Sequence, residues 1–265
     1  MARSFLRQIA EHDCTVVRVD NRDIGLSTKF DDVCPNPGEL VEKAFKGEQV
    51  EAPYNIYDMA RDTAELIKVV SNGPAHIVGR SMGGMIGQRV AIRYPEVIAS
   101  LCSVASSAGN PAQRARGEEV MNFFTLPPAT TYEEQIQRAV DGDRLFSGTF
   151  FEFDEETDYK KRADMRARSD DTTGGQRHML SFSAEDPEER YQQHRTDLMK
   201  LDLPVTVIHG SDDNLLNVAN GIETAELIPN ANLVIIDGMA HELPAGAWPQ
   251  IIPAIIETVD RGQPS

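Results

Sequence analysis

A serine in a short, glycine-bounded turn is the residue of this chain whose context best suits covalent chemistry. Residues 79–83 read Gly-Arg-Ser-Met-Gly; a short apolar run precedes them, and apolar residues at helical spacing follow. A sharp turn between a strand and a helix can project Ser81 as a nucleophile, and Gly79 and Gly83 would relieve crowding on either side of it. Chance supplies such a pentapeptide in about one chain in ten of this length. The motif therefore indicates a nucleophile only if other catalytic residues can be found in the chain.

A serine nucleophile requires a base that takes its proton and an acid that orients the base. Asp213 and His241 each lie in a loop that directly follows a short apolar run. Loops beyond the carboxyl ends of parallel strands form the ligand-binding edge of open α/β sheets. The chain order predicts a triad of Ser81, Asp213 and His241. Asp212 is an alternative candidate for the acid. Either Asp212 or Asp213 could instead only cap the helix that follows.

The remaining histidines are expected to have no catalytic role. Two lie in or at the end of predicted strands, where a buried structural role is expected: His76 and His209. Three lie in polar helical or loop sequence and are expected to face solvent: His12, His178 and His194. His241 could also be an ordinary surface residue, but its place after a strand and a glycine turn favours the role of base.

The predicted elements place the three residues of the triad on one sheet. Apolar runs that alternate with helical patterns predict an α/β fold with a mostly parallel sheet flanked by helices. The expected strands span 15–20, 75–78, 98–104, 203–208 and 233–236. Residues 1–109 and 201–265 are expected to form the core. Residues 110–200 are rich in charge and are expected to form an inserted helical segment, the predicted lid, in which Thr130 and Glu133 suggest a capping box.

The composition restricts the partners and the setting of the protein. The 265-residue chain has a formal net charge of −16. This charge disfavours nucleic acid and anionic membranes as partners, because both need a basic face. The three cysteines lack the spacing of a metal site or a disulfide framework, and no apolar stretch reaches the length of a membrane span. We expect a cytoplasmic protein with no nucleic-acid or membrane partner, and the sequence indicates no oligomeric state.

The segments around the predicted triad resemble one known superfamily. Gly-Arg-Ser-Met-Gly-Gly at 79–84, His-Gly-Ser-Asp-Asp at 209–213 and Gly-Met-Ala-His-Glu-Leu-Pro at 238–244 resemble the α/β-hydrolase superfamily. Residues 20–27 and the last motif are similar to its esterase branch, which includes aclacinomycin methylesterases and related bacterial carboxylesterases. The resemblance spans nearly the whole chain and is weakest in the predicted lid. It implies four roles and no cofactor: nucleophile Ser81, general base His241, orienting acid Asp213, and the backbone N–H of Met82 as an oxyanion donor.

The resemblance also implies elements that this chain does not contain before its first helix. Three strands and their connections would need about 33 residues, whereas only Met1 to Ser4 precede Phe5. We expect the chain to be N-terminally truncated relative to the family and to lack the loop that carries the second oxyanion donor. The segment 15–20 must then pair directly with the strand at 75–78 or leave a gap. An upstream start and a genuine short form both stay open.

These residues predict a serine hydrolase of small-molecule carboxylic esters that acts through an acyl-enzyme on Ser81. Carbon–carbon bond hydrolysis and cofactor-free perhydrolysis would use the same triad and stay open, as does a non-catalytic relic of the fold. Five phenylalanines of the predicted lid could line an apolar pocket or equally pack a core: Phe123, Phe124, Phe150, Phe151 and Phe153.

Overall fold

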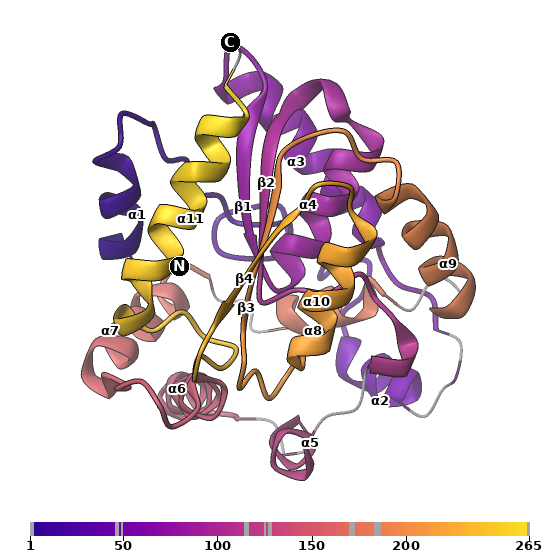
Figure 1. Cartoon of the computed structure of the whole chain (residues 1–265). Helices are drawn as coiled ribbons and strands as arrows, with labels where there is room; N and C mark the ends of the chain where they lie inside the picture. The colour runs from indigo at the N-terminus through magenta and orange to yellow at the C-terminus, as the bar shows by residue number, and fades with distance from the viewer. Residues whose placement is uncertain are drawn as a thin grey trace.

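The computed structural model describes residues 3–45, 48, 50–113, 117–124, 126, 129–169, 173–182 and 187–263. In these ranges four parallel strands form one sheet in the spatial order β1-β2-β3-β4 (Figure 1). The strands are β1 (Ala75–Arg80), β2 (Ile98–Val104), β3 (Val205–Gly210) and β4 (Asn232–Ile236). The predicted parallel α/β sheet is therefore confirmed, with four of its expected strands.

Helices connect and flank these strands. The α-helices are α1 (Arg3–Ala10), α2 (Pro37–Phe45), α3 (Ile56–Val70), α4 (Met82–Arg93), α5 (Glu118–Phe124), α6 (Tyr132–Ser147), α7 (Glu155–Arg166), α8 (Gly174–Leu180), α9 (Pro187–Leu198), α10 (Val218–Leu227) and α11 (Trp248–Arg261). Short 3₁₀ turns are η1 (Pro95–Val97), η2 (Pro111–Gln113) and η3 (Ala245–Ala247). None of the helices in the described ranges combines the length and the apolar character that crossing a membrane requires.

Alternate residues of the central strands β2 and β3 pack into two apolar layers, one on each face of the sheet. Leu101 of β2 and Val207 of β3 pack with α3, α4 and α10 on one face of the sheet. Their neighbours Cys102 and Ile208 pack with α1 and α11 on the other face. Because side chains along a strand alternate between faces, a continuous apolar run serves both layers at once.

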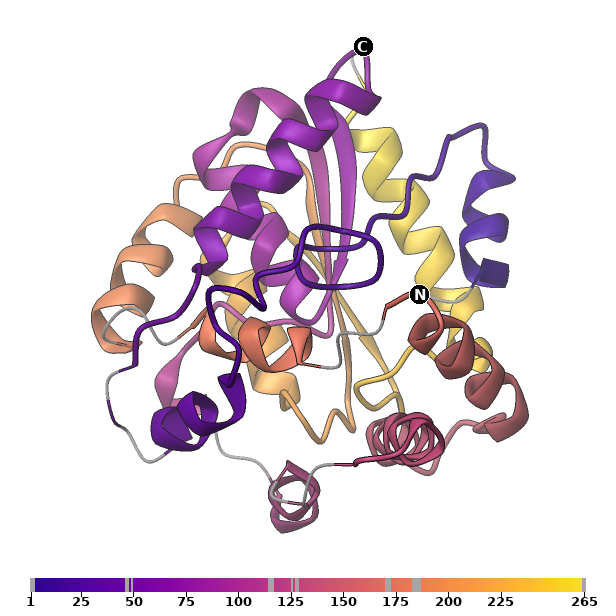
Figure 2. The ribbon, with the colours of Figure 1, turned by 180° about the vertical axis from the view of Figure 1, so that it is seen from behind.

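The helices of the predicted lid lie at one end of the sheet. Helices α5 to α9 connect β2 to β3, and the described part of 110–200 contains no strand. Figures 1 and 2 show α5, α6 and α8 gathered beyond the carboxyl ends of the strands, with α2 beside them. These helices face the edge of the sheet at which the predicted catalytic loops emerge.

The predicted strand at 15–20 is wrong. This segment runs as irregular chain outside the sheet, and β1 is the edge strand of the described sheet. Val16 packs partly against the layer of α1 and α11, whereas Val17 and Val19 are 54% and 46% exposed. The segment does not pair with β1, so no backbone ladder holds it as a strand, and solvent can satisfy its exposed polar groups.

The capping box of α6 lies one residue later than predicted. The Thr131 hydroxyl accepts a hydrogen bond from the backbone of Glu134, and the Glu134 carboxylate accepts one from the backbone of Thr131. Thr130-x-x-Glu133 and Thr131-x-x-Glu134 both fit the sequence pattern. The structure adopts the second register, and α6 buries Ile136.

Candidate active site

Ser81 occupies a strained turn between β1 and α4. Its backbone has φ 52° and ψ −122°, a conformation that residues other than glycine rarely adopt. The Ser81 N–H donates to the Val104 carbonyl at 2.8 Å, and the Ser106 hydroxyl donates to the Ser81 carbonyl at 2.8 Å. These bonds from β2 and the loop after it hold the turn, as expected for a nucleophile at the end of a strand.

Only one of the two predicted turn glycines is sterically required. A Cβ on Gly79 would collide with the backbone of Gly83, but a Cβ on Gly83 would meet nothing within 4 Å. Gly84 takes the second steric role, because a Cβ there would lie 2.6 Å from the Cβ of Ser106. The interpretation of Gly83 is therefore wrong, and close approach of α4 to the loop after β2 is the reason for glycine at 84.

The three residues of the predicted triad meet at the carboxyl edge of the sheet. His241 Nε2 lies 3.0 Å from the Ser81 Oγ, and His241 Nδ1 lies 2.9 Å from the Asp213 Oδ2. Asp213 follows β3 and His241 follows β4, and both side chains are buried. Asp212, the alternative acid, is exposed and bonds to the hydroxyl of Ser211. The geometry thus brings Asp213, and not Asp212, to the imidazole.

Asp213 is held in its charged form by several donors. Its Oδ1 accepts the backbone N–H groups of Leu215 at 2.9 Å and Leu216 at 2.8 Å. Burial by itself would raise the pKa of Asp213, but hydrogen bonds from His209 and His241 lower this pKa far below its ordinary value. A carboxylate that stays ionised can orient an imidazole and stabilise the imidazolium formed when it takes a proton.

His209 contacts the same carboxylate as His241 does. Its Nε2 donates to the Leu216 carbonyl at 2.7 Å and lies 3.2 Å from the Asp213 Oδ2, and the side chain is fully buried. The expectation of a buried structural histidine is confirmed, and the contact with Asp213 is an addition to it. The available signal was its position at the end of a strand, four residues before the aspartate.

An ion pair joins the serine turn to the histidine loop. Arg80, the residue before Ser81, lies 2.6 Å from the Glu242 carboxylate and donates to the His241 carbonyl at 3.3 Å. The predicted lid reaches the same loop, because the Glu242 N–H donates to the Phe146 carbonyl at 3.0 Å. The Phe146 ring lies edge-on to the His241 imidazole, with 6.3 Å between the ring centroids. The histidine loop is thus tied both to the serine turn and to α6.

Met82 begins α4 immediately after Ser81, and both residues line the same cavity. The first backbone N–H groups of a helix have no acceptor within the helix and can bind an anion. The role of the Met82 N–H as an oxyanion donor stays a prediction.

Ser81 opens into a cavity of about 540 Å³ between the core and the predicted lid. The described lining residues come from α2, the serine turn, α4, the loop after β2 with η2, α5, α8 and the turn after it, α9, the loop after β3 and α10: Val41, Ala44, Ser81, Met82, Met85, Arg89, Ser107, Gly109, Asn110, Gln113, Met121, Met179, Leu180, Phe182, Arg190, Leu215, Leu216 and Asn220. The five phenylalanines considered for this role are not among these residues. Phe123 packs edge-on against Phe124, and Phe151 packs against the layer of α1 and α11.

Two histidines that were expected to face solvent are buried. His178 is 8% exposed and donates from Nε2 to the Arg22 carbonyl at 2.7 Å. His194 is 1% exposed, and its Nε2 lies 2.9 Å from the amide oxygen of Gln88. Their polar neighbours in sequence suggested exposure, but the residues that bury them lie more than 100 positions away in the chain. Among the described residues, no three His, Cys, Asp or Glu side chains gather in a way that could hold a metal ion.

Comparisons with known proteins agree with this architecture. A family profile described as the alpha/beta hydrolase fold matches residues 1–244. Rhodomycin D methylesterase DauP of Streptomyces sp. (strain C5) is 24% identical over 270 residues, which cover 95% of this chain and 83% of that protein. Rhodomycin D methylesterase DnrP of Streptomyces peucetius is 25% identical over 274 residues, with the same coverage.

The solved structures extend the likeness to the fold. The crystal structure of a bromoperoxidase from Bacillus anthracis is similar to this structure, with a TM-score of 0.63 at 22% identity. The match covers 97% of this chain and 86% of the bromoperoxidase chain. The match to the family profile spans most of the chain, including β1, the serine turn and the histidine loop. This chain therefore belongs to the α/β-hydrolase fold family and is a hydrolase.

Proposed function

We propose that this hydrolase cleaves carboxylic esters through an acyl-enzyme on Ser81. The observation that carries the proposal is the continuous chain of contacts from the Ser81 hydroxyl through the His241 imidazole to the Asp213 carboxylate. A hydroxyl, an imidazole and a carboxylate linked in this order form the arrangement that activates serine for acyl transfer.

The first half of the reaction forms the acyl-enzyme. The Ser81 Oγ attacks the ester carbonyl carbon while its proton passes to the His241 Nε2. The negative charge that develops on the carbonyl oxygen is stabilised by the backbone N–H of Met82. The imidazolium then gives its proton to the leaving alkoxide, so that an alcohol departs and the acyl group stays on Ser81.

The second half returns the enzyme to its starting state. His241 takes a proton from a water molecule, whose oxygen attacks the acyl carbon. Collapse of the tetrahedral intermediate breaks the bond to the Ser81 Oγ, which regains its proton from His241, and the carboxylic acid is released. Throughout, Asp213 holds the imidazole through Nδ1 and stays ionised.

The relatives support ester chemistry in particular. DauP and DnrP are named as methylesterases, and their similarity covers 95% of this chain. The cavity of about 540 Å³ has the size of a small-molecule site and contains the Ser81 hydroxyl. We further propose that the predicted lid, residues 110–200, forms one wall of this site, because α5, α8 and α9 contribute lining residues.

Turnover and covalent labelling test the proposal together. We expect the protein to hydrolyse short-chain aryl esters, and Ser81→Ala to lose at least about 1,000-fold in kcat. An aryl phosphonate should label the protein once, on Ser81, as read by peptide mass spectrometry. Ser71→Ala, which removes a hydroxyl at the end of α3, is the matched control and should keep full turnover.

Two results would contradict the proposal. Full turnover by Ser81→Ala would remove Ser81 from the mechanism. Failure of the folded wild-type chain both to hydrolyse esters and to react with the phosphonate would exclude the acyl-enzyme.

A further inference from the structure

The His209 side chain is buried beneath the loop that follows β3. It is 0% exposed, and its Nε2 donates to the Leu216 carbonyl at 2.7 Å. A carbonyl oxygen can only accept a hydrogen bond, so the Nε2 atom carries a proton. The same Nε2 lies 3.2 Å from the Asp213 Oδ2. One N–H group therefore faces two acceptors, a backbone carbonyl and the carboxylate of the predicted triad.

Close packing against α10 restricts the His209 imidazole. Gly221 of α10 faces the ring, and a Cβ at this residue would lie 2.5 Å from the His209 Nδ1 and 2.7 Å from the His209 Cβ. Glycine inside a helix is normally less favourable than alanine. The space that the imidazole occupies explains the glycine at this position. The ring is therefore held between α10 and the loop after β3.

Leu216 connects this imidazole to the carboxylate by a second route. Its carbonyl accepts the hydrogen bond from His209, and its N–H donates to the Asp213 Oδ1 at 2.8 Å. The Leu215 N–H donates to the same oxygen at 2.9 Å. The His209 side chain thus ties the donors of Oδ1 back to the end of β3, and the orientation of the carboxylate depends on this loop.

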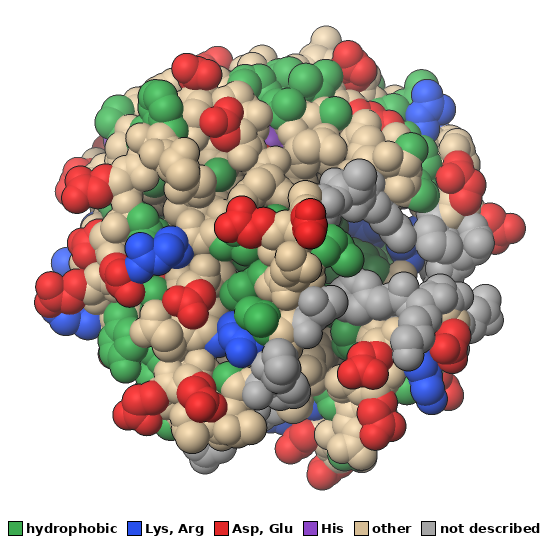
Figure 3. Space-filling model, turned by 90° about the horizontal axis from the view of Figure 1, so that it is seen from below, with side chains coloured by type: hydrophobic (Ala, Val, Ile, Leu, Met, Phe, Trp, Pro, Cys, Tyr) green, Lys and Arg blue, Asp and Glu red, His purple; other side chains and the backbone are tan. Residues whose placement is uncertain are grey.

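The same loop forms part of the cavity wall. Leu215 and Leu216 line the cavity that contains the Ser81 hydroxyl. Figure 3 shows this end of the molecule, where hydrophobic side chains are visible inside a hollow. A displaced loop would therefore have two measurable effects. It would change substrate binding through the wall, and it would change the orientation of the catalytic imidazole through the carboxylate.

Two effects of His209 on the triad have opposite signs. An N–H group close to Oδ2 draws charge from the oxygen that holds His241, whereas a fixed carboxylate improves the alignment of the imidazole. The contact of His209 with Oδ2 is 3.2 Å, and that of His241 is 2.9 Å. Strong charge-assisted hydrogen bonds are no longer than about 2.9 Å, so the charge drawn by His209 is small. Alignment outweighs it, because a misplacement of about 1 Å in a catalytic group can cost about 100-fold in rate.

We propose that His209 is a positioning residue that fixes the Asp213 carboxylate and the loop after β3, and thereby orients the His241 imidazole toward Ser81. His209 is not among the described residues that line the cavity, so it acts through Asp213 and not on the substrate. Groups that hold a catalytic side chain from behind restrict its orientation in this way. This inference rests on the ester hydrolysis proposed above.

His209→Leu and His209→Gln separate positioning from packing. Leucine fills buried space but has no donor, whereas the glutamine amide can donate to the Leu216 carbonyl. We expect His209→Leu to lower kcat for a short-chain aryl ester by about 10- to 100-fold, and to change KM by less than about fivefold. His209→Gln should recover most of the lost kcat. A loss confined to KM would show that His209 only shapes the cavity wall.

His76→Leu is the matched control for the loss of a strand histidine. His76 lies near the start of β1, and its Nδ1 is 2.8 Å from the Ser100 Oγ, at the end of the sheet opposite to the triad. This variant should keep wild-type kcat. Urea unfolding establishes that each variant is folded under the assay conditions. Wild-type kcat in folded His209→Leu would overturn the inference while ester hydrolysis stands.

Gly221→Ala displaces the same imidazole without removing its donor. Its methyl group would press on the ring from α10, and alanine suits a helix better than glycine does. We expect kcat to fall in this variant as well, which extends the test to a chain that keeps every polar group of the triad. Wild-type kcat in Gly221→Ala would contradict the requirement for a fixed imidazole at 209.

Proton NMR of the substrate-free protein separates this inference from the proposed function. The His241 Nδ1 proton bound to Asp213 should resonate far downfield of the amide protons and vanish in His241→Gln. We expect this resonance to move upfield or broaden in His209→Leu and Gly221→Ala, and to return in His209→Gln. An unchanged resonance in the first two variants would overturn the inference even for an active esterase. The expected shifts in a protein that hydrolyses no ester would support the positioning contact and contradict the proposed function.

Discussion

Two buried aspartates of this protein differ in what surrounds them. Asp213 is 5% exposed and is held by two imidazoles and two backbone N–H groups. Asp23 is 1% exposed, and the Arg177 Nε lies 3.0 Å from its Oδ2. The same oxygen accepts the Tyr54 hydroxyl at 2.5 Å, and Oδ1 accepts the Phe30 N–H at 2.8 Å. Both carboxylates are fully engaged, but only the first is bonded to imidazoles, which exist in a neutral and a protonated form.

The difference assigns the two carboxylates to different tasks. An imidazole can take and return a proton, so in the proposed mechanism Asp213 stabilises an imidazolium charge that forms and disappears during turnover. Arg177 stays charged. Burial raises the pKa of Tyr54, and the hydrogen bond to Asp23 raises it further, so the phenol stays protonated. Asp23 therefore forms a permanent link between its loop and α8 of the predicted lid, which contributes Met179 and Leu180 to the cavity.

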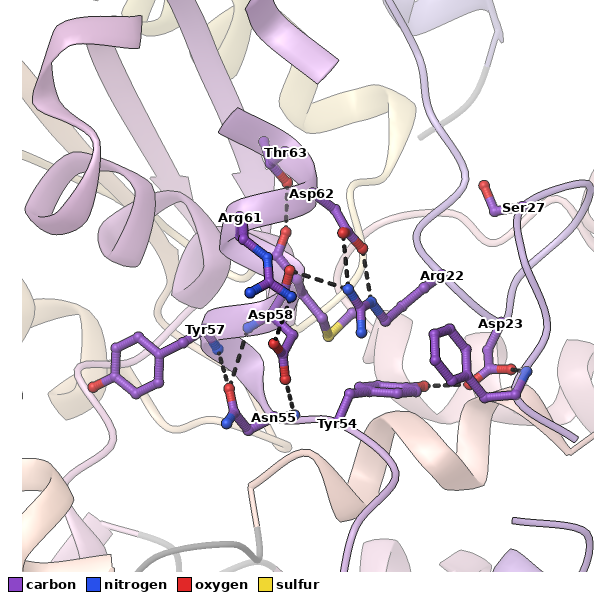
Figure 4. A network of polar contacts seen from close by, with 12 residues as sticks. Arg22, Asp23, Ser27, Tyr54, Asn55, Tyr57, Asp58, Arg61, Asp62 and Thr63 are labelled. Atoms are coloured by element: carbon purple, nitrogen blue, oxygen red, sulfur yellow. Dashed lines mark hydrogen bonds and ion pairs between the residues drawn. The ribbon is translucent and has the colours of Figure 1, made fainter. Parts of the chain in front are cut away.

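A second layer surrounds the link at Asp23. Figure 4 shows the Tyr54 hydroxyl directed at Asp23 and the Arg22 guanidinium paired with Asp62 of α3. Arg22 also lies over the rings of Tyr54, at 4.9 Å, and Phe30, at 5.1 Å. The polar contacts of this region thus join three parts of the chain that are distant in sequence.

The same substitution at both aspartates separates the two tasks, and the largest effect is expected at Asp213. Asp213→Asn leaves the shape of the site intact but no longer holds the imidazole in its working tautomer, and should lower kcat by about 10,000-fold. Its free energy of unfolding should fall less than that of Asp23→Asn, because imidazole partners can lose their protons. Steady-state ester hydrolysis and urea unfolding measure the two quantities.

Asp212→Asn is the matched control for this prediction. Asp212 is the adjacent residue of the same type, but its side chain is exposed. It should retain wild-type kcat. A comparable loss in both variants would mean that the loop, and not the Asp213 carboxylate, carries the effect.

Asp23→Asn is expected to act on stability. Removing one charge of a buried pair takes away the carboxylate that faces the Arg177 guanidinium and should lower the free energy of unfolding by about 3 to 5 kcal/mol. Asparagine tolerates the positive φ of 67° at this position, so backbone strain should not add to the loss. Urea unfolding checks the value against Asp31→Asn, a substitution at an exposed site. Unchanged stability with abolished turnover would instead place Asp23 in the chemistry.

The link at Asp23 is also expected to weaken in acid. Burial lowers the pKa of His178, which donates to Arg22 and packs edge-on to Tyr54 at 6.3 Å. Below the ordinary histidine pKa of 6.5, the unfolded chain takes up a proton that the native state resists. Stability should therefore fall with falling pH, by at most about 1.4 kcal/mol per pH unit for this group.

Urea unfolding at about pH 7.5 and 5.5 measures this slope. In His178→Gln, whose amide can still donate to the Arg22 carbonyl, the loss between the two pH values should be smaller. Some loss should persist, because the buried His194 also has a lowered pKa. An identical slope in His178→Gln would show that His178 does not couple this region to pH.

The smallest effect is expected at the outer ion pair. Asp62 pairs with Arg22 at 2.7 Å, but its side chain is 47% exposed. Asp62→Ala should lower the free energy of unfolding by at most about 1 kcal/mol, and added salt should reduce the difference further. A loss as large as that of Asp23→Asn would mean that the stacking of Arg22 on Tyr54 depends on this pair.

The comparison also explains which features could be predicted. Asp213 and Asp23 both lie in polar loops, but Asp213 directly follows a strand and stands in the order expected of a triad. Asp23 follows the segment 15–20. This segment forms no strand, because it pairs with none of the four strands of the described sheet. Its link to Arg177 spans 154 residues (177 − 23), and no local pattern reports such a pairing.

The sequence alone determined the parallel α/β architecture, the serine turn and the order of Ser81, Asp213 and His241, because these depend on the local alternation of strands, turns and helices. Only the tertiary structure decided between Asp212 and Asp213, placed His209 on the same carboxylate, and buried His178 and His194. Those outcomes depend on which distant side chains fill the space around a group, and the periodicity of a sequence contains no measure of that space.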